Sequence, residues 1–456
     1  MGATPLAMLG LDRVVGRLSA ITAHDCFDGR HGGVYVPRTL PVRAFATPLE
    51  VGQALLGCDE VVDRLRLRPG KIALLAADEE SERLAAGFGH SLALAPVAAR
   101  RRIAAVTELV HLARDAGVHA LPAVTGHAAS YQDLLLLARG LGTDLLVESL
   151  DRPGEEAVPI VSLADWAAHE RRLAAANLRV TRRIDGPGFT LVAVVGGAGT
   201  IVSPLVACVR RVPDVAPGGS VALVSDVAAN LDAELVAELR AAAVRLGERF
   251  ASEGFEGLVE LDLAVDRRGG GPTLTAIRPD GSLATILDTV SAVGADELPA
   301  LALHLAAHLG ADLEEDVRRF VERPPDSARE PWSLMLLEDA GDDPESVTEA
   351  PASGIWRRDP SAHGGVGYVR SATDWKAVSA EDDEAFYLRI ARAGSVRQAG
   401  TEVGVVVSRG QALDAGGQAS ESTLQWARGI LKNFWTTPAP ADALPEGSPI
   451  PGVAVL

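Results

Sequence analysis

The stretch GLVELDLAVDRRGGGPTLTAIRP, residues 257–279, decides the fold of this chain. Its first and last parts alternate apolar with polar residues, and the RRGGG between them is rich in glycine. Alternation with a period of two is typical of strands, and a short glycine-containing break between two such runs is typical of a hairpin. We therefore predict a strand–turn–strand hairpin over about 258–278 that places Asp262 and Ala276 side by side.

Helices and strands are predicted on both sides of this hairpin from the same periodicities. Helical spacing of apolar residues indicates helices over 51–65, 81–88, 99–118, 130–142, 162–176, 231–254, 296–310 and 421–435, with Ser130 and Ser162 as N-cap residues. Short apolar runs indicate strands over 71–78, 91–97, 143–150, 332–338, 365–370, 384–391 and 403–410, and two strands around a glycine turn within 189–209. This order predicts an α/β unit with a partly parallel sheet, followed by α+β units.

Changes in composition along the chain divide it into consecutive units, and one segment is typical of a linker. The proline-rich and charged segment ERPPDSAREP, 322–331, is typical of a linker. The predicted units are 1–98, 99–180, 181–321 and 332–435, followed by a proline- and alanine-rich tail over 436–456.

The charge of the protein excludes two classes of partner. The chain has 456 residues, a net charge of −18 and a pI near 5.0. Nucleic acids and anionic membranes are polyanions, so neither is an expected partner. Only three lysines are present, at 71, 376 and 432, so chemistry that needs a lysine has three candidates.

The cysteines and histidines give no metal or disulfide framework. Cys26, Cys58 and Cys208 are odd in number and widely spaced, which fits a reducing cytoplasm. His304 and His308 have helical zinc-ligand spacing but no third ligand nearby in the sequence. The N-terminus has no signal-peptide pattern, and no apolar run is long enough to span a membrane, so we expect a cytoplasmic protein.

The order of several segments resembles the biotin-carboxylase-like branch of the ATP-grasp superfamily, in particular actinobacterial members with a C-terminal extension. The segments that carry the resemblance are RRRIAAVTELVHLARDAGVHALPAV (100–124), SYQDLLLLARGLGTDLLVES (130–149), LRVTRRIDGPGFTLVAVVGGAGTIVSPLV (178–206), EGFEGLVELDLAVD (253–266), EAPASGIWRRD (349–359), YVRSATDW (368–375) and EAFYLRIA (384–391). The resemblance implies an α/β pre-ATP-grasp domain followed by two α+β lobes that clamp ATP. It also implies a ligase that joins a carboxylate to an amine or thiol through an acyl phosphate.

The phosphate loop departs from the pattern of the resembled family. That family carries a glycine-rich loop with a lysine, whereas SLDRPGEEAVP (149–159) has one glycine and no lysine. Three acids, Asp151, Glu155 and Glu156, would repel a polyphosphate, and Arg152 is the only cation of the loop.

The metal site departs from the family pattern as well. Glu260 or Asp262 matches the first acid, but Ala276 stands where the second acid is expected and Arg278 where an asparagine is expected. Alanine has no donor atom and guanidinium is a cation, so neither can bind magnesium. We predict that Arg278 pairs with Glu260 or Asp262; a phosphate contact and simple exposure remain the alternatives.

Four other arginines are candidate nucleotide contacts by position. Arg101 and Arg102 lie near the first basic position of the family, and Arg182 and Arg183 lie on the hinge strand beside the adenine position. The alternative for each of them is a solvent-exposed side chain with no ligand.

Two functions are favoured, and binding of another small ligand in the cleft is the remaining alternative. In the first, the chain is a pseudo-enzyme without a cofactor, an interaction or regulatory module that pairs with a second copy or with an ATP-grasp paralogue. The apolar strand VGVVVSRG (403–410) would then offer an edge to the partner. In the second, it is a ligase that uses ATP and Mg²⁺ through a rearranged site. No catalytic residue is assigned in either.

Overall fold

The computed structural model describes residues 1–439 except 3, 12–14, 16–17, 41–44, 46–47, 68–69, 152–156, 217–218, 227–230, 267–270, 316–317, 319–329, 340, 342, 380–382, 399 and 415–416. The predicted tail, apart from its first four residues, and most of the predicted linker therefore lie outside the described residues. No helix within the described residues is long and apolar enough to cross a membrane.

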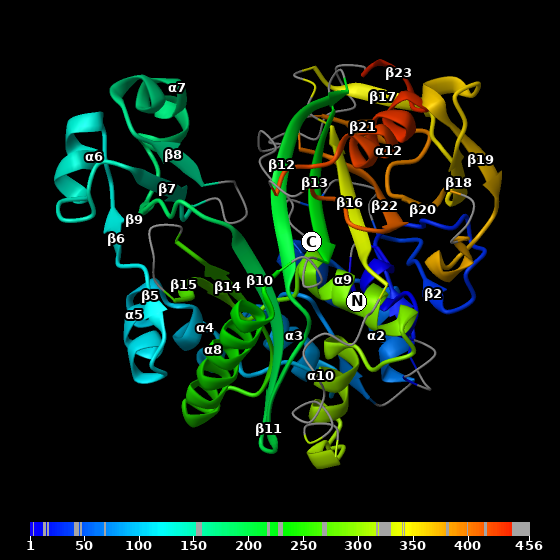
Figure 1. Ribbon diagram of the computed structural model, residues 1–456. Helices are drawn as coiled ribbons and strands as arrows, with labels where there is room; N and C mark the ends of the chain where they lie inside the picture. Colours follow the sequence, from blue (N-terminus) through cyan, green and yellow to red (C-terminus); the bar gives the residue numbers. More distant parts are fainter. Residues whose placement is uncertain are drawn as a thin grey trace.

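A 12-stranded sheet runs through the centre of the molecule (Figure 1). From one edge to the other its strands are β19 (Val366–Arg370), β18 (Gly354–Arg358), β20 (Glu384–Arg389), β22 (Glu402–Arg409), β16 (Trp332–Asp339), β13 (Gly219–Asp226), β12 (Val206–Ala216), β10 (Gly188–Gly196), β14 (Gly257–Ala264), β15 (Thr273–Arg278) and β5 (His119–Ala120), with β11 (Gly199–Val202) beside β10. The pairs between β19 and β15 are antiparallel, and only β5 joins in parallel. The two strands predicted around a glycine turn within 189–209 are β10 and β11, and β12 begins at Val206.

Five strands after residue 331, namely β16, β18, β19, β20 and β22, continue this sheet. β16 pairs with β13 on one side and with β22 on the other, so the C-terminal strands and the hairpin strands share one sheet. The expectation that VGVVVSRG offers a free edge is wrong, because β22 is paired along its length with both β16 and β20. The predicted apolar run is explained by this central position, in which both faces of the strand are covered.

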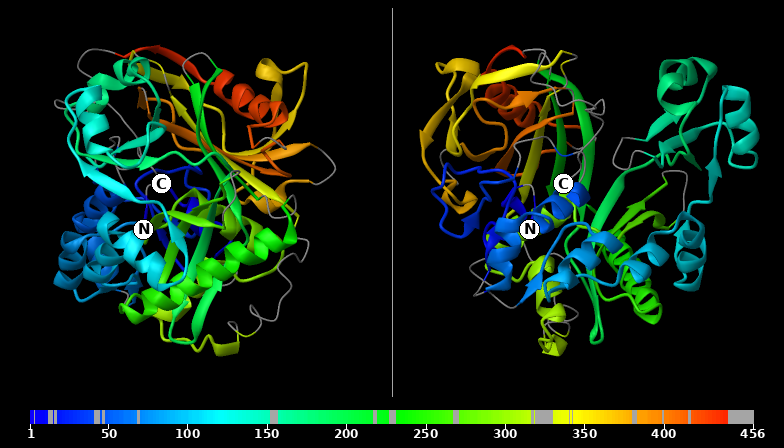
Figure 2. Two further views of the ribbon diagram at one scale, coloured as in Figure 1. Left: turned by 60° about the vertical axis from the view of Figure 1, so that its left-hand side comes forward. Right: turned by 180° about the vertical axis from the view of Figure 1, so that it is seen from behind.

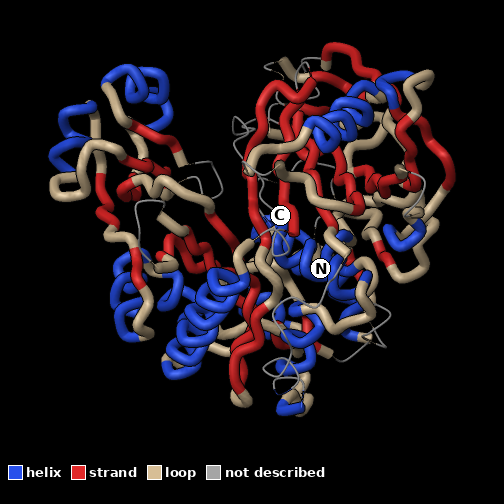
Figure 3. Tube along the Cα trace, in the orientation of Figure 1, coloured by secondary structure: helices blue, strands red, loops and turns tan. Residues whose placement is uncertain are grey.

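Helices cover both faces of the sheet and bury three apolar cores (Figure 3). They are α4 (Val97–Ala104), α5 (Val106–Asp115), α8 (Ala233–Ser252), α9 (Leu283–Gly294), α10 (Ala300–His308) and α12 (Glu421–Lys432). The single helix predicted over 99–118 is wrong: Ala105 has an extended backbone (ψ 123°), which separates α4 from α5. Helix α9 was not predicted at all.

A small lobe, residues 123–182, stands beside the large sheet (Figures 1 and 2). Its elements are β6 (Ala123–Gly126), α6 (Tyr131–Leu137), β7 (Leu145–Ser149), β8 (Val158–Ile160), α7 (Leu163–Leu173) and β9 (Leu178–Arg182), and its sheet order is β6-β9-β7-β8. The predicted N-caps are confirmed, since the side chains of Ser130 and Ser162 accept hydrogen bonds from the backbone of the first turn of α6 and α7.

The N-terminal region contains short strands and helices that lie beside the large sheet (Figure 2). They are η1 (Leu6–Met8), β1 (Ala20–Ile21), β2 (Val34–Tyr35), α1 (Pro48–Leu56), α2 (Asp59–Arg66), β3 (Lys71–Ile72), α3 (Glu79–Gly87) and β4 (Ser91–Leu92). The parallel pairing expected here is present, but only as two short pairs, β1 with β2 and β3 with β4. A 3-stranded sheet of β21 (Val396–Arg397), β17 (Glu345–Glu349) and β23 (Trp435–Pro438), and the turns η4 (His363–Gly365) and η5 (Trp375–Ala377), complete the C-terminal part.

Glu384 ties β18, β19 and β20 together and should make the stability of this region depend on pH. Its buried carboxylate accepts hydrogen bonds from Arg370 (2.7 and 2.8 Å), Ser379 N–H (3.1 Å) and Arg357 (3.0 Å). The guanidinium of Arg370, followed by these other donors, outweighs burial and lowers the pKa of Glu384 to about 2. Because the folded-state pKa is below the ordinary value of 4.5, its stabilisation is complete above about pH 4.5 and is lost as the pH falls towards 2.

We therefore expect Glu384→Gln to lower the free energy of unfolding by about 1–2 kcal/mol at pH 7, a value reduced because both arginines are partly solvated. The difference between the variant and the parent should shrink at pH 3. Urea denaturation of both proteins at the two pH values measures it. An equal difference at pH 7 and pH 3 would show that the Glu384 carboxylate is not the origin of the effect.

Candidate functional site

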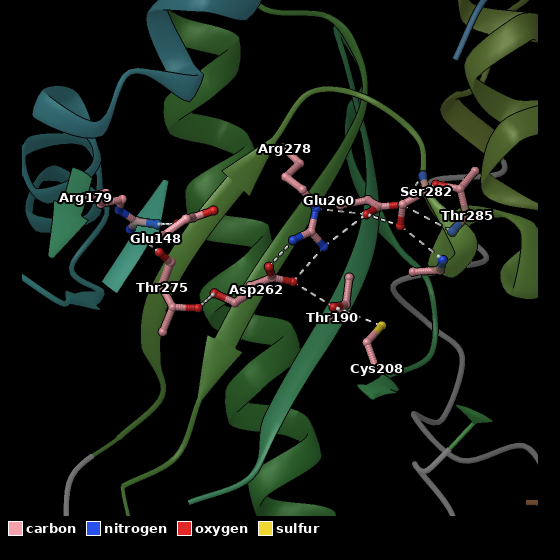
Figure 4. Close-up of polar contacts among 11 residues, drawn as sticks. Glu148, Arg179, Thr190, Cys208, Glu260, Asp262, Thr275, Arg278, Ser282 and Thr285 are labelled. Atoms are coloured by element: carbon pink, nitrogen blue, oxygen red, sulfur yellow. Dashed lines mark hydrogen bonds and ion pairs between the residues drawn. The ribbon is translucent and has the colours of Figure 1, made fainter. Parts of the chain in front are cut away.

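The hairpin β14–β15 has the register that the sequence predicts. Asp262 is directly opposite Ala276, and Glu260 is directly opposite Arg278. Strand β14 lies between β10 and β15, and Glu260 and Asp262, two positions apart, project from the same face of it (Figure 4).

Glu260 is fully buried and has a complete set of hydrogen-bond donors. Ser282 donates from its N–H (2.8 Å) and its hydroxyl (2.7 Å), and Thr285 donates from its hydroxyl (2.7 Å) and its N–H (3.3 Å). Ser282 is the N-cap of α9, so the carboxylate sits at the N-terminus of that helix, where the helix dipole favours negative charge. Glu260 thus anchors α9 to the hairpin.

Arg278 lies between the two acids of the hairpin (Figure 4). Its Nε and Nη2 donate to Glu260 Oε2 (3.3 and 3.1 Å), its Nη2 donates to Asp262 Oδ1 (2.8 Å), and its Nη1 contacts Asp262 Oδ2. Burial alone would lower the pKa of Arg278, but the carboxylates of Asp262 and Glu260 outweigh burial and raise it above its ordinary value. The predicted ion pair is confirmed, and it joins Arg278 to both acids at once.

The neighbouring strand β10 supplies a further hydrogen bond to Asp262. Thr190 donates its hydroxyl proton to Asp262 Oδ1 (2.7 Å), and the Thr190 oxygen is 3.6 Å from the sulfur of Cys208. Burial raises the pKa of Cys208 to about 11, so its thiol is protonated at neutral pH and is a poor metal ligand.

These residues do not fit a magnesium ion. Magnesium requires about six oxygen ligands in octahedral geometry. Ala276 offers no oxygen from its side chain, Arg278 brings a positive charge, and the carboxylate oxygens of Glu260 are taken by the donors of Ser282, Thr285 and Arg278. Within the described residues no group of three or more histidine, cysteine, aspartate or glutamate side chains is arranged to hold a metal ion.

Arg101 and Arg102, which were predicted to contact the nucleotide, form ion pairs with acids outside the β14–β15 hairpin. Arg101 pairs with Glu79 and Arg102 with Glu253 (3.2 Å), and both arginines are exposed. Arg152, the cation of the predicted phosphate loop, lies outside the described residues.

The two hinge arginines, Arg182 at the end of β9 and Arg183 directly after it, have different partners. Arg183 pairs with Asp144 (2.7 Å) inside the small lobe. Arg182 pairs with Asp266 (3.1 Å), two residues beyond the end of β14. Of the six predicted arginines, the structure brings Arg278 to the acids of the hairpin, and Arg182 reaches the segment that follows its first strand.

Arg100 is a buried arginine near the hairpin that the sequence analysis missed. It donates to the carbonyl of Ala77 (2.8 Å) and contacts Asp280, two residues after Arg278. The signal was present, because Val97, Arg100 and Ile103 lie at helical spacing and form the buried face of α4.

His304 of the α10 histidine pair has a structural role. The rings of His304 and His308 are 4.6 Å apart. His304 accepts from Leu258 N–H at Nδ1 (3.0 Å) and its Nε2 lies 2.8 Å from the carbonyl of Ala93, so both ring nitrogens are used. Burial lowers the pKa of His304 to about 3, which keeps the ring neutral.

The large sheet, the small lobe and the hairpin at their junction define the ATP-grasp fold, and solved structures with this fold match most of the chain. The biotin carboxylase domain of *Hydrogenobacter thermophilus* 2-oxoglutarate carboxylase, solved as a dimer with MgADP, ADP and bicarbonate, has a TM-score of 0.57 at 11% identity over 96% of this chain and 88% of that chain. N5-carboxyaminoimidazole ribonucleotide synthetase from *Thermus thermophilus* has a TM-score of 0.53 at 16% identity over 90% of this chain and 92% of that chain. The L-amino acid ligase from *Bacillus licheniformis* has a TM-score of 0.52 at 13% identity over 96% of both chains. No family model and no curated protein matches the sequence.

Proposed function

We propose that this protein is a pseudo-enzyme, an ATP-grasp scaffold that serves as an interaction or regulatory module without metal-dependent phosphoryl transfer. The observation that carries the proposal is the guanidinium of Arg278, which bridges Glu260 and Asp262. Its positive charge takes the role that a divalent cation would have between two acids.

Displacing this guanidinium in favour of magnesium would be costly. Arg278 would lose its hydrogen bonds to both carboxylates, and Glu260 would have to give up donors from the N-terminus of α9. Removing one partner from a fully buried ion pair costs about 3–5 kcal/mol, and we expect about 2–3 kcal/mol here because the Arg278 side chain is 27% exposed. The acids of the 149–159 segment oppose polyphosphate binding independently.

The proposal includes a partner and a place. We propose that the partner is a second copy of the chain or an ATP-grasp paralogue in the cytoplasm, and that the chain derives from the actinobacterial branch with a C-terminal extension. The *Hydrogenobacter* biotin carboxylase domain, which was solved as a dimer, supports pairing through this fold.

The second candidate function is an ATP- and Mg²⁺-dependent ligase that joins a carboxylate to an amine or thiol. The similarity in fold to N5-carboxyaminoimidazole ribonucleotide synthetase and L-amino acid ligase favours it. In that case Asp262 would be the metal ligand, and Arg278 would have to move away from it on nucleotide binding.

Release of ADP from ATP distinguishes the two functions. The protein is incubated at stoichiometric concentration with Mg·ATP, bicarbonate and a mixture of amino acids, and the matched control is Asp262→Asn. We expect the parent and the control to release ADP at the same background rate. Magnesium-dependent release that disappears in Asp262→Asn would establish the ligase and contradict the pseudo-enzyme.

A further inference from the structure

The small lobe has an apolar core of its own. Every buried residue of this core lies between 128 and 180, and none is shared with the cores of the large sheet. The core consists of Ala128, Leu134, Ala138, Leu145, Val147, Val158, Ile160, Trp166, Leu173, Ala176, Leu178 and Val180. The small lobe can therefore rotate relative to the large sheet without disrupting the apolar core of either part. Polar contacts at the junction can then set the position of the lobe.

Arg179 makes one such polar contact. It is opposite Glu148 in the register of β9 and β7, its side chain is 12% exposed, and its Nη1 lies 3.3 Å from the Glu148 carboxylate. Its Nη2 crosses to the hairpin and donates to the carbonyl oxygen of Thr275 in β15 at 2.5 Å (Figure 4). The ion pair with Glu148 thus orients the Arg179 guanidinium, and its Nη2 binds the large sheet at Thr275.

Thr275 connects this contact to the Arg278 cluster. Its hydroxyl donates to the backbone carbonyl of Asp262 (3.1 Å), across the hairpin. The residue that receives the Arg179 hydrogen bond is thus itself fixed to the strand that carries the acids.

Arg182 makes a second contact from the same strand of the small lobe. Its Nη1 is 3.1 Å from the carboxylate of Asp266, which follows β14 and has a side chain that is only 12% exposed. The two arginines of β9 therefore reach both arms of the hairpin. Arg183 differs, because its partner Asp144 belongs to the small lobe.

We infer that Arg179 and Arg182 form a latch that holds the small lobe on the β14–β15 hairpin, so that side chains of the protein fix the relative position of the lobes without a ligand. Hydrogen bonds from a guanidinium are directional and charge-assisted, so two of them at one junction restrict rotation. The inference does not depend on the proposed function, since it concerns the protein without nucleotide.

Hydrogen–deuterium exchange of the full-length protein without nucleotide tests the latch. Methionine replaces each arginine, because it keeps an unbranched apolar stem and removes the donors. In the double variant Arg179→Met/Arg182→Met we expect amide exchange to rise about tenfold in the two chain crossings, read over residues 121–127 and 184–190 so that no substituted position is included. Each single variant should show a smaller rise in the same segments.

Arg183→Met is the matched control, since Arg183 directly follows β9 and its ion pair is with Asp144 of the small lobe, not with the hairpin. Exchange in this control should stay within about twofold of the parent at the crossings. Crossings unchanged in both single variants and the double variant would overturn the inference. An equal rise in Arg183→Met, or faster exchange throughout α6 and β7, would also overturn it, because the arginines would then stabilise the lobe itself.

Discussion

Arg278→Ala should lower the free energy of unfolding by about 2–3 kcal/mol, the largest loss expected from any single arginine described above. The reason is the charge left behind: Glu260 is fully buried, and Asp262 has a side chain that is only 17% exposed. Without the guanidinium, the two carboxylates, which lie two positions apart on the same face of β14, would have only neutral donors around them. Urea denaturation at pH 7 gives the difference from the midpoint and the slope.

Arg101→Ala is the matched control for this loss. Arg101 also pairs with an acid, but its side chain is 66% exposed, and exposed pairs contribute about 0–1 kcal/mol. If Arg278→Ala proved no more destabilising than Arg101→Ala, the Arg278 cluster would not be the buried ion pair that the structure describes.

The double variant Ala276→Glu/Arg278→Asn should gain a divalent-cation site. It removes the built-in cation and places a second carboxylate directly opposite Asp262, with an amide oxygen opposite Glu260. Oxygen donors of this kind are what magnesium and manganese prefer. We expect Mn²⁺, followed by its electron paramagnetic resonance signal, to bind the variant at least about tenfold more tightly than it binds the parent.

Ala276→Gln/Arg278→Asn is the control, since it has the same shape without the added charge and should bind Mn²⁺ more weakly. We expect no ATP turnover in either variant, because the 149–159 segment still carries acids and no lysine. Magnesium-dependent turnover by the glutamate variant would mean that the phosphate segment is not the obstacle proposed here.

The sequence predicted the elements whose two faces differ. The hairpin register followed from alternation around RRGGG, and the caps at Ser130 and Ser162 followed from side-chain chemistry. Helix α9 escaped because Leu283 to Val293 are buried all around, so no polar face marks the period. Polar residues of α9 are buried too, because their side chains hydrogen-bond to acids of the sheet, as Thr285 does to Glu260 and Ser291 does to Asp226.

Long-range pairing set the other limits. An apolar strand looks alike at an edge and in the centre of a sheet, so the position of β22 between β16 and β20 was not accessible from its own residues. At the site, the pairing of Arg278 followed from local register, whereas the contact of Arg100 with Asp280 joins residues 180 positions apart. The roles of Arg152 and of the phosphate segment stay predictions.

Calorimetric titration of the unmodified protein with Mg·ATP shows whether Arg278 and the 149–159 segment leave a place for the metal–nucleotide complex. We predict no saturable heat, with a dissociation constant weaker than about 1 mM, which corresponds to a binding free energy of about −4 kcal/mol. A stoichiometric binding curve with a dissociation constant in the low micromolar range, about −8 kcal/mol, would contradict it.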